Sequence, residues 1–133
     1  MKTNPSVYLA GYVKETEYRQ YSKDKYGKEI DFFDPISEFE DNFLLPIEES
    51  FDIVTKEKYQ IEQSNILVAY IKRKTIGTTM EIMHAFNNGI PVFVIVEDEA
   101  FKSDLWLAYH TTRFFNSIDD CMQYIIHTSN TEG

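Results

Sequence analysis

The sequence predicts an α/β fold in which a parallel β-sheet carries helices on both faces. Short runs rich in β-branched and aromatic residues alternate along the chain with longer segments of helical composition, and this alternation is typical of parallel sheets with crossover helices. The run at residues 66–71 is apolar throughout, as expected of a central strand buried on both faces. With 133 residues and 43% hydrophobic content, the chain has the size and apolar content of one domain. We therefore expect a single domain over residues 1–133.

The first half of the chain contains two of the expected strands. Residues 7–10 form the first strand, which Gly11 ends, and residues 30–33 form the second, which an Asp-Pro pair stops. The polar segment between them, residues 15–25, has helical composition. Residues 36–47 are acidic and aromatic without a clear period, so we expect a long loop there, of the kind that often covers a ligand site.

The middle of the chain predicts one βαβ unit preceded by a helix. The helix is expected over residues 48–63, and the central strand follows at 66–71. A loop at 72–78 then leads to a second helix over 79–88, and a further apolar strand occupies 92–96. This unit places the loop 72–78 at the carboxyl end of the central strand.

The last part of the chain completes the sheet. A loop through Trp106 leads to a final strand at 113–115, and Ser117 opens a terminal helix. Five parallel strands with right-handed crossovers fit most simply into the flavodoxin-like order 2-1-3-4-5. We therefore expect a doubly wound, five-stranded parallel sheet.

Composition and charge narrow the class of partner. The formal net charge is −9 and the sequence pI is about 4.7, which argues against a nucleic-acid polymer because such partners select basic surfaces. The single cysteine, Cys121, allows neither an intramolecular disulfide nor a cysteine metal cluster. The sequence contains neither a secretory signal pattern nor an apolar run long enough to span a bilayer. We expect a soluble cytoplasmic protein that binds a small molecule and not a membrane.

Ligands of doubly wound sheets lie beyond the carboxyl ends of the strands. In this chain that edge comprises residues 11–14, the loop 72–78 and the helix that follows the loop. Glu81 is expected in the first turn of this helix, where unpaired N–H groups and the helix dipole favour an ionised carboxylate and hence a nucleophile. The spacing of Thr78 and Glu81 also fits a capping box, in which the carboxylate has only a structural role.

Two segments resemble a known enzyme family. Residues 77–92, GTTMEIMHAFNNGIPV, match the signature G-T-x-x-E-[IL]-x-x-A-x-x-x-G-x-P-V of nucleoside 2-deoxyribosyltransferases. Residues 7–11, VYLAG, resemble the family's opening strand, and the resemblance extends to the terminal helix. It implies that Glu81 attacks the anomeric carbon of a nucleoside, expels the base and holds the sugar covalently until a second base or water arrives. The family uses no cofactor.

The resemblance also assigns roles to Tyr8 and Glu57. Tyr8 matches the tyrosine that orients the nucleophile, although it also fits an ordinary strand aromatic. Glu57 stands where the family has the acid that protonates the leaving base, usually a shorter Asp. Independently of the family, Glu57 is four residues from Ile53 and from Ile61, which places it in an apolar helical stripe. A partly desolvated carboxyl of this kind has a raised pKa, but a glutamate at the edge of the stripe could equally reach water.

Thr75 marks a departure from the family pattern. Transferases that act on free nucleosides usually carry Asp there, which accepts a hydrogen bond from the sugar 5′-hydroxyl. The related deoxynucleoside 5′-monophosphate N-hydrolases carry a hydroxyl residue that donates to phosphate. Residues 72–74, Lys-Arg-Lys, and Lys14 add cations near Thr75, although they also fit a solvated turn. Residues 11–14 lack the Gly-Ser-x-Arg phosphate-binding pattern of the hydrolases, so the sequence leaves nucleoside and nucleotide open.

The expected substrate contacts are Gly11, Tyr12, Thr75, Gly77, Thr78 and Asp104. Tyr12, with Phe39 and Phe43 of the long loop, could stack on a planar base. By resemblance, Asp104 or Trp106 reaches the site of a neighbouring subunit, which implies a homo-oligomer. The three histidines have no metal-ligand spacing, so no metal is expected.

Three hypotheses follow for the function. The first is a nucleoside deoxyribosyltransferase with Glu81, Tyr8 and Glu57 as its catalytic residues. The second is a nucleoside 5′-monophosphate N-glycosidase on the same fold, in which water replaces the acceptor base. The third is a non-catalytic nucleotide-binding module, which predicts stabilisation by ligand without release of base.

Overall fold

The computed structural model describes residues 3–39 and 47–132. Its centre is a five-stranded parallel sheet in the order β2-β1-β3-β4-β5, which confirms the predicted topology. The strands are β1 (Ser6–Gly11), β2 (Asp31–Phe33), β3 (Ile66–Tyr70), β4 (Val92–Ile95) and β5 (Arg113–Phe115). Because β1 and β3 are neighbours with crossovers leaving in opposite directions, their carboxyl ends form the switch point where such sheets bind ligands.

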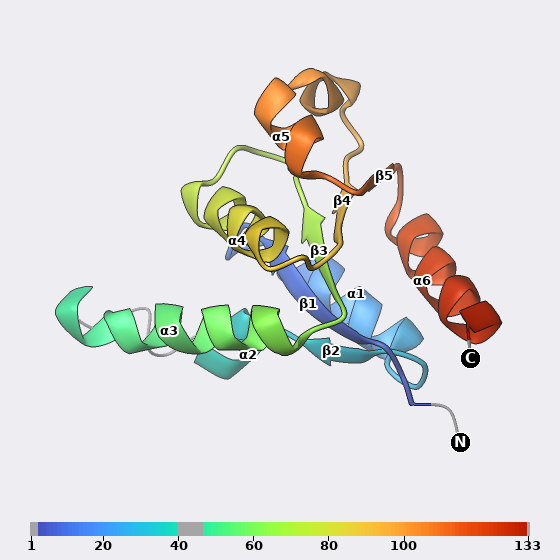
Figure 1. Ribbon diagram of the computed structural model, residues 1–133, viewed down its shortest axis with the longest axis horizontal. Helices are drawn as coiled ribbons and strands as arrows, with labels where there is room; N and C mark the ends of the chain where they lie inside the picture. The colour runs from blue at the N-terminus through green and yellow to red at the C-terminus, as the bar shows by residue number, and fades with distance from the viewer. Residues whose placement is uncertain (1–2, 40–46, 133) are drawn as a thin grey trace.

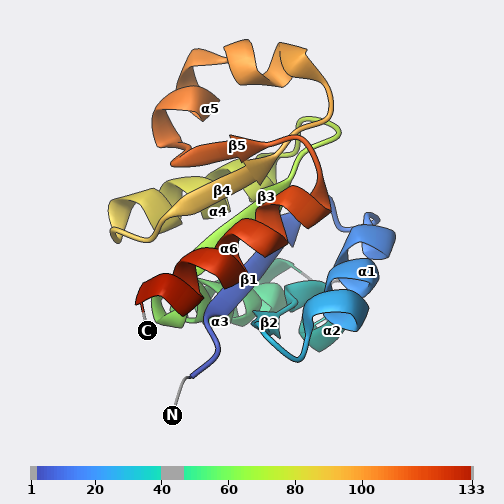
Figure 2. The ribbon, with the colours of Figure 1, turned by 90° about the vertical axis from the view of Figure 1, so that its right-hand side faces the viewer.

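Helices cover both faces of this sheet (Figures 1 and 2). The helical elements are α1 (Thr16–Tyr26), α2 (Pro35–Phe39), α3 (Ile47–Gln63), α4 (Ile76–Asn87), the short 3-10 helix η2 (Glu99–Ser103), α5 (Leu105–His110) and α6 (Ile118–Glu132). The first and last helices, α1 and α6, pack together on one face, whereas α3 and α4 pack together on the other. Figure 1 shows α4 between α3 and α5. None of the helices in the described part of the chain is long and apolar enough to cross a membrane.

The alternation of side chains along β1 divides the core into two clusters. Val7 and Leu9 belong to the cluster beneath α1 and α6, whereas Tyr8 and Ala10 belong to the cluster beneath α3 and α4. All four side chains are fully buried, because successive residues of a strand point to opposite faces. Tyr8 is therefore directed toward the face on which the carboxylates of α3 and α4 lie.

Three segments differ from the sequence-based expectation. Residues 35–39, expected in a loop, form α2, and the expected loop through Trp106 contains η2 and α5. Helix α4 begins at Ile76, three residues before the expected start. The rest of the expected long loop, residues 40–46 with Phe43, lies outside the described residues.

Gly11, at the end of β1, is required by its conformation and by its neighbours. Its φ is +151°, and a Cβ there would lie 3.1 Å from the carbonyl oxygen of Tyr70 and 3.3 Å from the Tyr18 ring. We expect Gly11→Ala to destabilise the fold by about 1–3 kcal/mol. Gly77 is the matched control, because a Cβ on this helical glycine meets nothing within 4 Å. Gly77→Ala should stabilise by about 0.5–1 kcal/mol, and urea unfolding of both variants measures the contrast. Equal effects would contradict it.

Candidate active site

The site begins with a hydrogen bond between β1 and α4. The Tyr8 hydroxyl donates to Oε2 of Glu81. Tyr8 is fully buried, and its ring stacks on Phe33 of β2 with centroids 5.6 Å apart. The sheet therefore fixes the phenol, and the phenol fixes one oxygen of the Glu81 carboxylate. The Glu81 carboxyl group is therefore oriented before a ligand binds.

Glu81 lies in the second turn of α4, not in the first. Helix α4 starts at Ile76, and its N-cap is Thr75, which has extended backbone angles and makes no side-chain capping hydrogen bond. The expected placement of Glu81 beside the unpaired N–H groups of the helix terminus is therefore wrong. The alternative capping box with Thr78 is wrong for the same reason, since Thr78 lies inside the helix.

The environment of Glu81 makes its ionised form unfavourable in the free protein. Burial raises the pKa of Glu81 to about 8; the Tyr8 hydrogen bond opposes the rise, the charge of Glu57 adds to it, and Arg19 lowers it. A carboxylate with a raised pKa holds its charge weakly and is correspondingly more basic. The chemical consequence is a nucleophile whose reactivity depends on one donated hydrogen bond.

Glu57 of α3 supplies the second carboxyl group. The neighbours Ile53 and Ile61 are buried and Glu57 is half-buried between them, as the four-residue spacing predicts. Burial raises the pKa of Glu57 to about 7, and the charge of Arg19 opposes that rise. Two interacting carboxyls with overlapping titrations share their protons. Over the interval between the two titrations, the pair carries one proton and one negative charge.

Tyr8→Phe tests the hydrogen bond to Glu81. Because the Tyr8 hydroxyl lowers the pKa of Glu81, its removal should move the acid limb of any pH–rate profile to higher pH. Loss of a hydrogen bond to a charged group should also lower kcat/KM by roughly 10- to 100-fold. The matched control is Tyr70→Phe, which removes a hydroxyl that donates to Glu97 at 2.7 Å. Equal effects of the two variants on the profile would contradict the assignment.

Arg19 is a charged group near the site that the sequence did not identify. It is 2% exposed, and it extends from α1 to the carboxyl end of β1, where Nη1 donates to the Leu9 carbonyl and Nη2 to the Gly11 carbonyl, both at 2.9 Å. The signal that could have identified it is the four-residue spacing of Tyr18, Ser22 and Tyr26, which are all buried. Arg19 adjoins this stripe, so its side chain points inward.

A separate cavity of about 390 Å³ lies between the first turns of α4 and the α5 region. Its lining includes three of the expected substrate contacts, Thr75, Thr78 and Asp104. Arg73 and Lys74 also line it, so cations and hydroxyl groups occur together at this end of the sheet. Asp104 has a structural partner as well, because its carboxylate caps α5 by accepting from the Leu107 amide at 2.9 Å.

The remaining expected contacts are divided between the two regions. The Arg73 guanidinium lies over the Tyr12 ring, 4.5 Å from its centroid, so this side chain joins the cavity to the loop after β1. Gly77 is exposed in α4 and Gly11 is packed against Arg19. The expected stacking residues Phe39 and Phe43 cannot be located, because neither side chain belongs to the described part of the structure.

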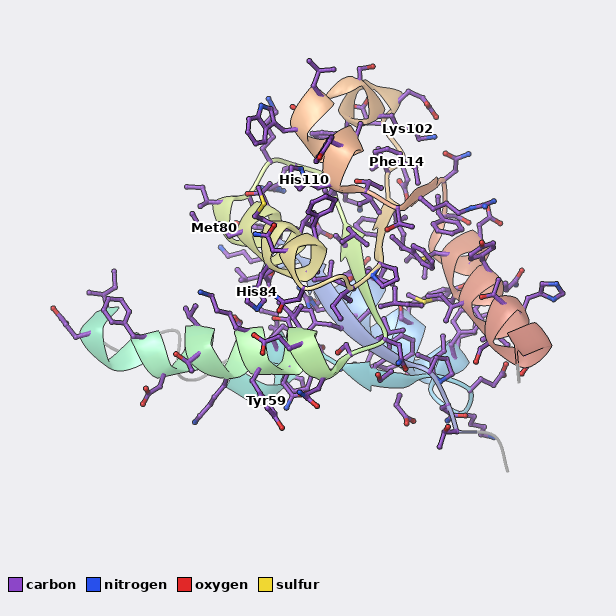
Figure 3. The ribbon with its side chains drawn as sticks, in the orientation of Figure 1. Tyr59, Met80, His84, Lys102, His110 and Phe114 are labelled. Carbon is purple, nitrogen blue, oxygen red and sulfur yellow. The ribbon has the colours of Figure 1, made fainter. Side chains whose placement is uncertain are left out.

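Two histidines, His84 and His110, have local partners. His84 of α4 pairs with Glu62 of α3 at 2.8 Å, and Figure 3 shows it at the junction of these helices. His110 bonds the Trp106 carbonyl and stacks with the Trp106 ring. Within the described residues, there is no group of three His, Cys, Asp or Glu side chains that could hold a metal ion.

The fold and site define an α/β protein with a half-buried, tyrosine-bonded carboxylate beside the switch point of its sheet. A family model described as "Nucleoside 2-deoxyribosyltransferase like" matches residues 4–99. The chain belongs to this family, as the resemblance in the sequence indicated. No curated protein matches the chain significantly in sequence.

Solved structures agree with this fold. A 2-deoxyribosyltransferase from Bacillus psychrosaccharolyticus is 16% identical with a TM-score of 0.74, and the match covers 93% of this chain and 95% of that one. A conserved protein from Enterococcus faecalis V583 is 18% identical with a TM-score of 0.70, over 95% and 99% of the two chains. A CMP N-glycosidase from Clostridium botulinum is 16% identical with a TM-score of 0.57, over 90% and 96%. At these identities, the likeness establishes the shared fold.

Proposed function

We propose that this protein cleaves the N-glycosidic bond of 2′-deoxynucleosides and transfers the deoxyribosyl group to another nucleobase through a covalent intermediate on Glu81. The observation that carries the proposal is the half-buried Glu81 carboxyl, which accepts the Tyr8 hydrogen bond and interacts with the Glu57 carboxyl. Nucleophilic catalysis at an anomeric carbon requires an oriented carboxylate and a second group that exchanges a proton with the leaving group. Family membership supports the same chemistry.

The reaction proceeds by two displacements. In the first, an Oε atom of Glu81 attacks C1′, the C1′–N bond breaks, and its electron pair goes to the base nitrogen. Glu57 gives its proton to the leaving base, so both carboxyls are ionised or esterified when the base is free. In the second displacement, a nitrogen of the acceptor base attacks C1′, its proton goes to Glu57, and the Glu81 carboxylate is regenerated. The raised pKa of Glu57 suits a group that alternates between acid and base near neutral pH.

A second candidate is hydrolysis of nucleoside 5′-monophosphates by the same pair of carboxyls. The observation that favours it is the grouping of Arg73, Lys74 and Thr75 around one cavity in an otherwise acidic chain. A phosphate is attracted by the two cations and accepts a hydrogen bond from a hydroxyl, whereas an aspartate at position 75 would repel it. Water would then take the place of the acceptor base.

One assay separates these reactions. Purified protein is incubated with deoxynucleosides or their 5′-monophosphates, each with and without an acceptor base, and the products are separated by chromatography. A new nucleoside formed only with acceptor supports the transferase. Free base released from monophosphates alone supports the hydrolase. If no mixture reacts while a nucleotide still raises the melting temperature, the protein is a binding module and the proposal is wrong.

As part of the same proposal, we expect a homo-oligomer, because large apolar side chains near Asp104 are exposed. Leu105 and Trp106 are 84% and 74% exposed at the start of α5, and Met80 of α4 also points into solvent (Figure 3). Contiguous exposed apolar side chains are typical of subunit interfaces. We expect sedimentation to give a dimer or larger species, and Trp106→Asp to shift it toward monomer. If the unmodified protein sediments as a monomer, the proposed homo-oligomer is wrong.

A further inference from the structure

We propose that Arg19 is a positioning residue of the Glu81 site: its buried guanidinium fixes the carboxyl end of β1, the strand that carries Tyr8, and its positive charge acts on the carboxyls of Glu57 and Glu81. The inference rests on the proposed function, and it concerns a residue on the helix layer opposite to α3 and α4. Three features of the structure support it: the pairing of β1 with its neighbours, the contacts of the Arg19 guanidinium and the charged groups around Arg19.

Strand β2 is too short to cover the end of β1. Their pairing runs from Ser6↔Asp31 to Tyr8↔Phe33 and stops there, whereas pairing with β3 continues to Gly11↔Tyr70. The β1 carbonyls beyond Tyr8 therefore lack a residue of β2 beside them. Buried carbonyl groups need donors, so another group must take the place of the missing strand.

The Arg19 guanidinium takes that place. It donates to the carbonyls of Leu9 and Gly11, and Nη1 also donates to the carboxylate of Asp34, which directly follows β2; all three distances are 2.9 Å. Tyr18, the preceding residue, donates to the Ala10 carbonyl at 2.6 Å. Three successive carbonyls of β1 are thus held by one dipeptide of α1. Tyr8 immediately precedes these carbonyls, so the clamp fixes the strand from which its hydroxyl reaches Glu81.

The charge of Arg19 is only partly neutralised by Asp34. Lys23 also contacts Asp34, with Nζ 2.9 Å from Oδ2, so two cations share one carboxylate. Burial opposes ionisation of Asp34, but the Lys23 hydrogen bond and the Arg19 charge outweigh burial and hold the pKa of Asp34 below its usual value. Asp34 therefore stays ionised, and one positive charge of the cluster remains available to the site.

The remaining positive charge acts on the catalytic carboxyls. Among the described residues, the charge of Arg19 affects the pKa of Tyr8 of β1, Tyr18 of α1, Asp34 after β2, Glu57 of α3 and Glu81 of α4. Lys23 of α1 contacts the partner of Arg19, Asp34. Arg19 lowers the pKa of both Glu57 and Glu81, against the larger effect of burial. Without this charge, both carboxyls would be harder to ionise, and the one-proton state of the pair would move to higher pH.

One nitrogen of the Arg19 guanidinium has no hydrogen-bond partner among the described residues, although the other two are held by β1 and Asp34. This atom, Nε, is buried. A buried polar atom without a partner costs free energy, and buried ion pairs contribute little net stability. An apolar side chain would avoid this cost, but it would leave the carbonyls of Leu9 and Gly11 without the donors that Arg19 supplies.

The test compares Asp34→Asn with the double variant Arg19→Met/Asp34→Asn. The double variant removes the guanidinium without leaving an unpaired buried carboxylate, which preserves the fold better than Arg19→Met alone. Proteins labelled with ¹³C at the glutamate carboxyl carbon are titrated by NMR, and Glu57 and Glu81 are assigned from Glu57→Gln and Glu81→Gln. Thermal melts verify that each variant is folded at every pH used.

We expect the two carboxyl titrations to move up by roughly one pH unit in the double variant. In Asp34→Asn they should stay in place or move down, because only a negative charge is lost. Identical midpoints in all three proteins, or an equal rise in both variants, would overturn the role of Arg19. The titration needs no substrate, so this result is independent of the proposed reaction. That reaction fails separately if Glu81→Gln turns over nucleosides normally.

Discussion

Glu81→Gln is expected to lower kcat for glycosidic cleavage by at least about 10⁴-fold, because it removes the nucleophile and leaves only binding and proton transfer. Glutamine has the same shape as the protonated carboxyl, and it still accepts the Tyr8 hydrogen bond through its carbonyl oxygen. The fold should therefore persist, and the melting temperature should not fall. Single-turnover release of base, followed by chromatography, measures the loss.

The matched control for this variant is Glu62→Gln. Glu62 is also a helical glutamate, but it lies on the surface of α3 and pairs with His84. Its loss should change turnover less than about twofold, since exposed ion pairs contribute little. Comparable activity in the two variants would remove Glu81 from the mechanism.

Glu57→Gln is expected to lower kcat/KM by about 10²- to 10⁴-fold, the usual contribution of a positioned general acid. The unmodified protein should give a bell-shaped profile of kcat/KM against pH. Below the titrations of the pair, both carboxyls are protonated and the nucleophile is absent. Above them, both are ionised and the acid is absent. With pKa values raised to about 7 for Glu57 and about 8 for Glu81, the maximum should lie near pH 7–8.

The profile of Glu57→Gln gives a second readout with a defined sign. The alkaline limb should disappear, because the acid that it reports is gone. One ascending limb should remain, and it should report Glu81 with a pKa below about 8, because the charge of Glu57 that raises this pKa is gone. An unchanged bell shape with a uniformly lower rate would show that Glu57 does not titrate in the reaction. Bases that leave without protonation should also lose less rate than bases that need a proton.

The strand order and both helix layers could be predicted from the sequence because apolar runs at the central strands β1, β3 and β4 alternate with helical segments. β3 and β4 are almost fully buried, and their patterns allow no other assignment. Helix α5 was missed because its six residues are too few to display a helical period. The start of α4 was misplaced because Thr78 looks like an N-cap, whereas the structure uses Thr75.

Site residues could be predicted where short sequence patterns identify them. They could not be predicted where their role depends on how distant strands pair in the sheet. Glu57 was identified by the family resemblance, and its four-residue distance from Ile53 and Ile61 placed it independently in an apolar stripe. The local sequence around Arg19 indicates only that its side chain points inward, because its contacts with β1 arise where β2 ends opposite Tyr8. The position of Glu81 in the second turn follows from the true helix start. Burial has the largest effect on the pKa of Glu81 and raises it.

The most direct measurement is mass spectrometry of the protein quenched in acid during incubation with a deoxynucleoside and no acceptor base. If Glu81 is the nucleophile, a peptide containing Glu81 should carry one deoxyribosyl group. Addition of an acceptor base before the quench should remove that group and yield the new nucleoside. Release of base from a protein whose Glu81 peptide stays unmodified at every quench time would contradict the covalent mechanism.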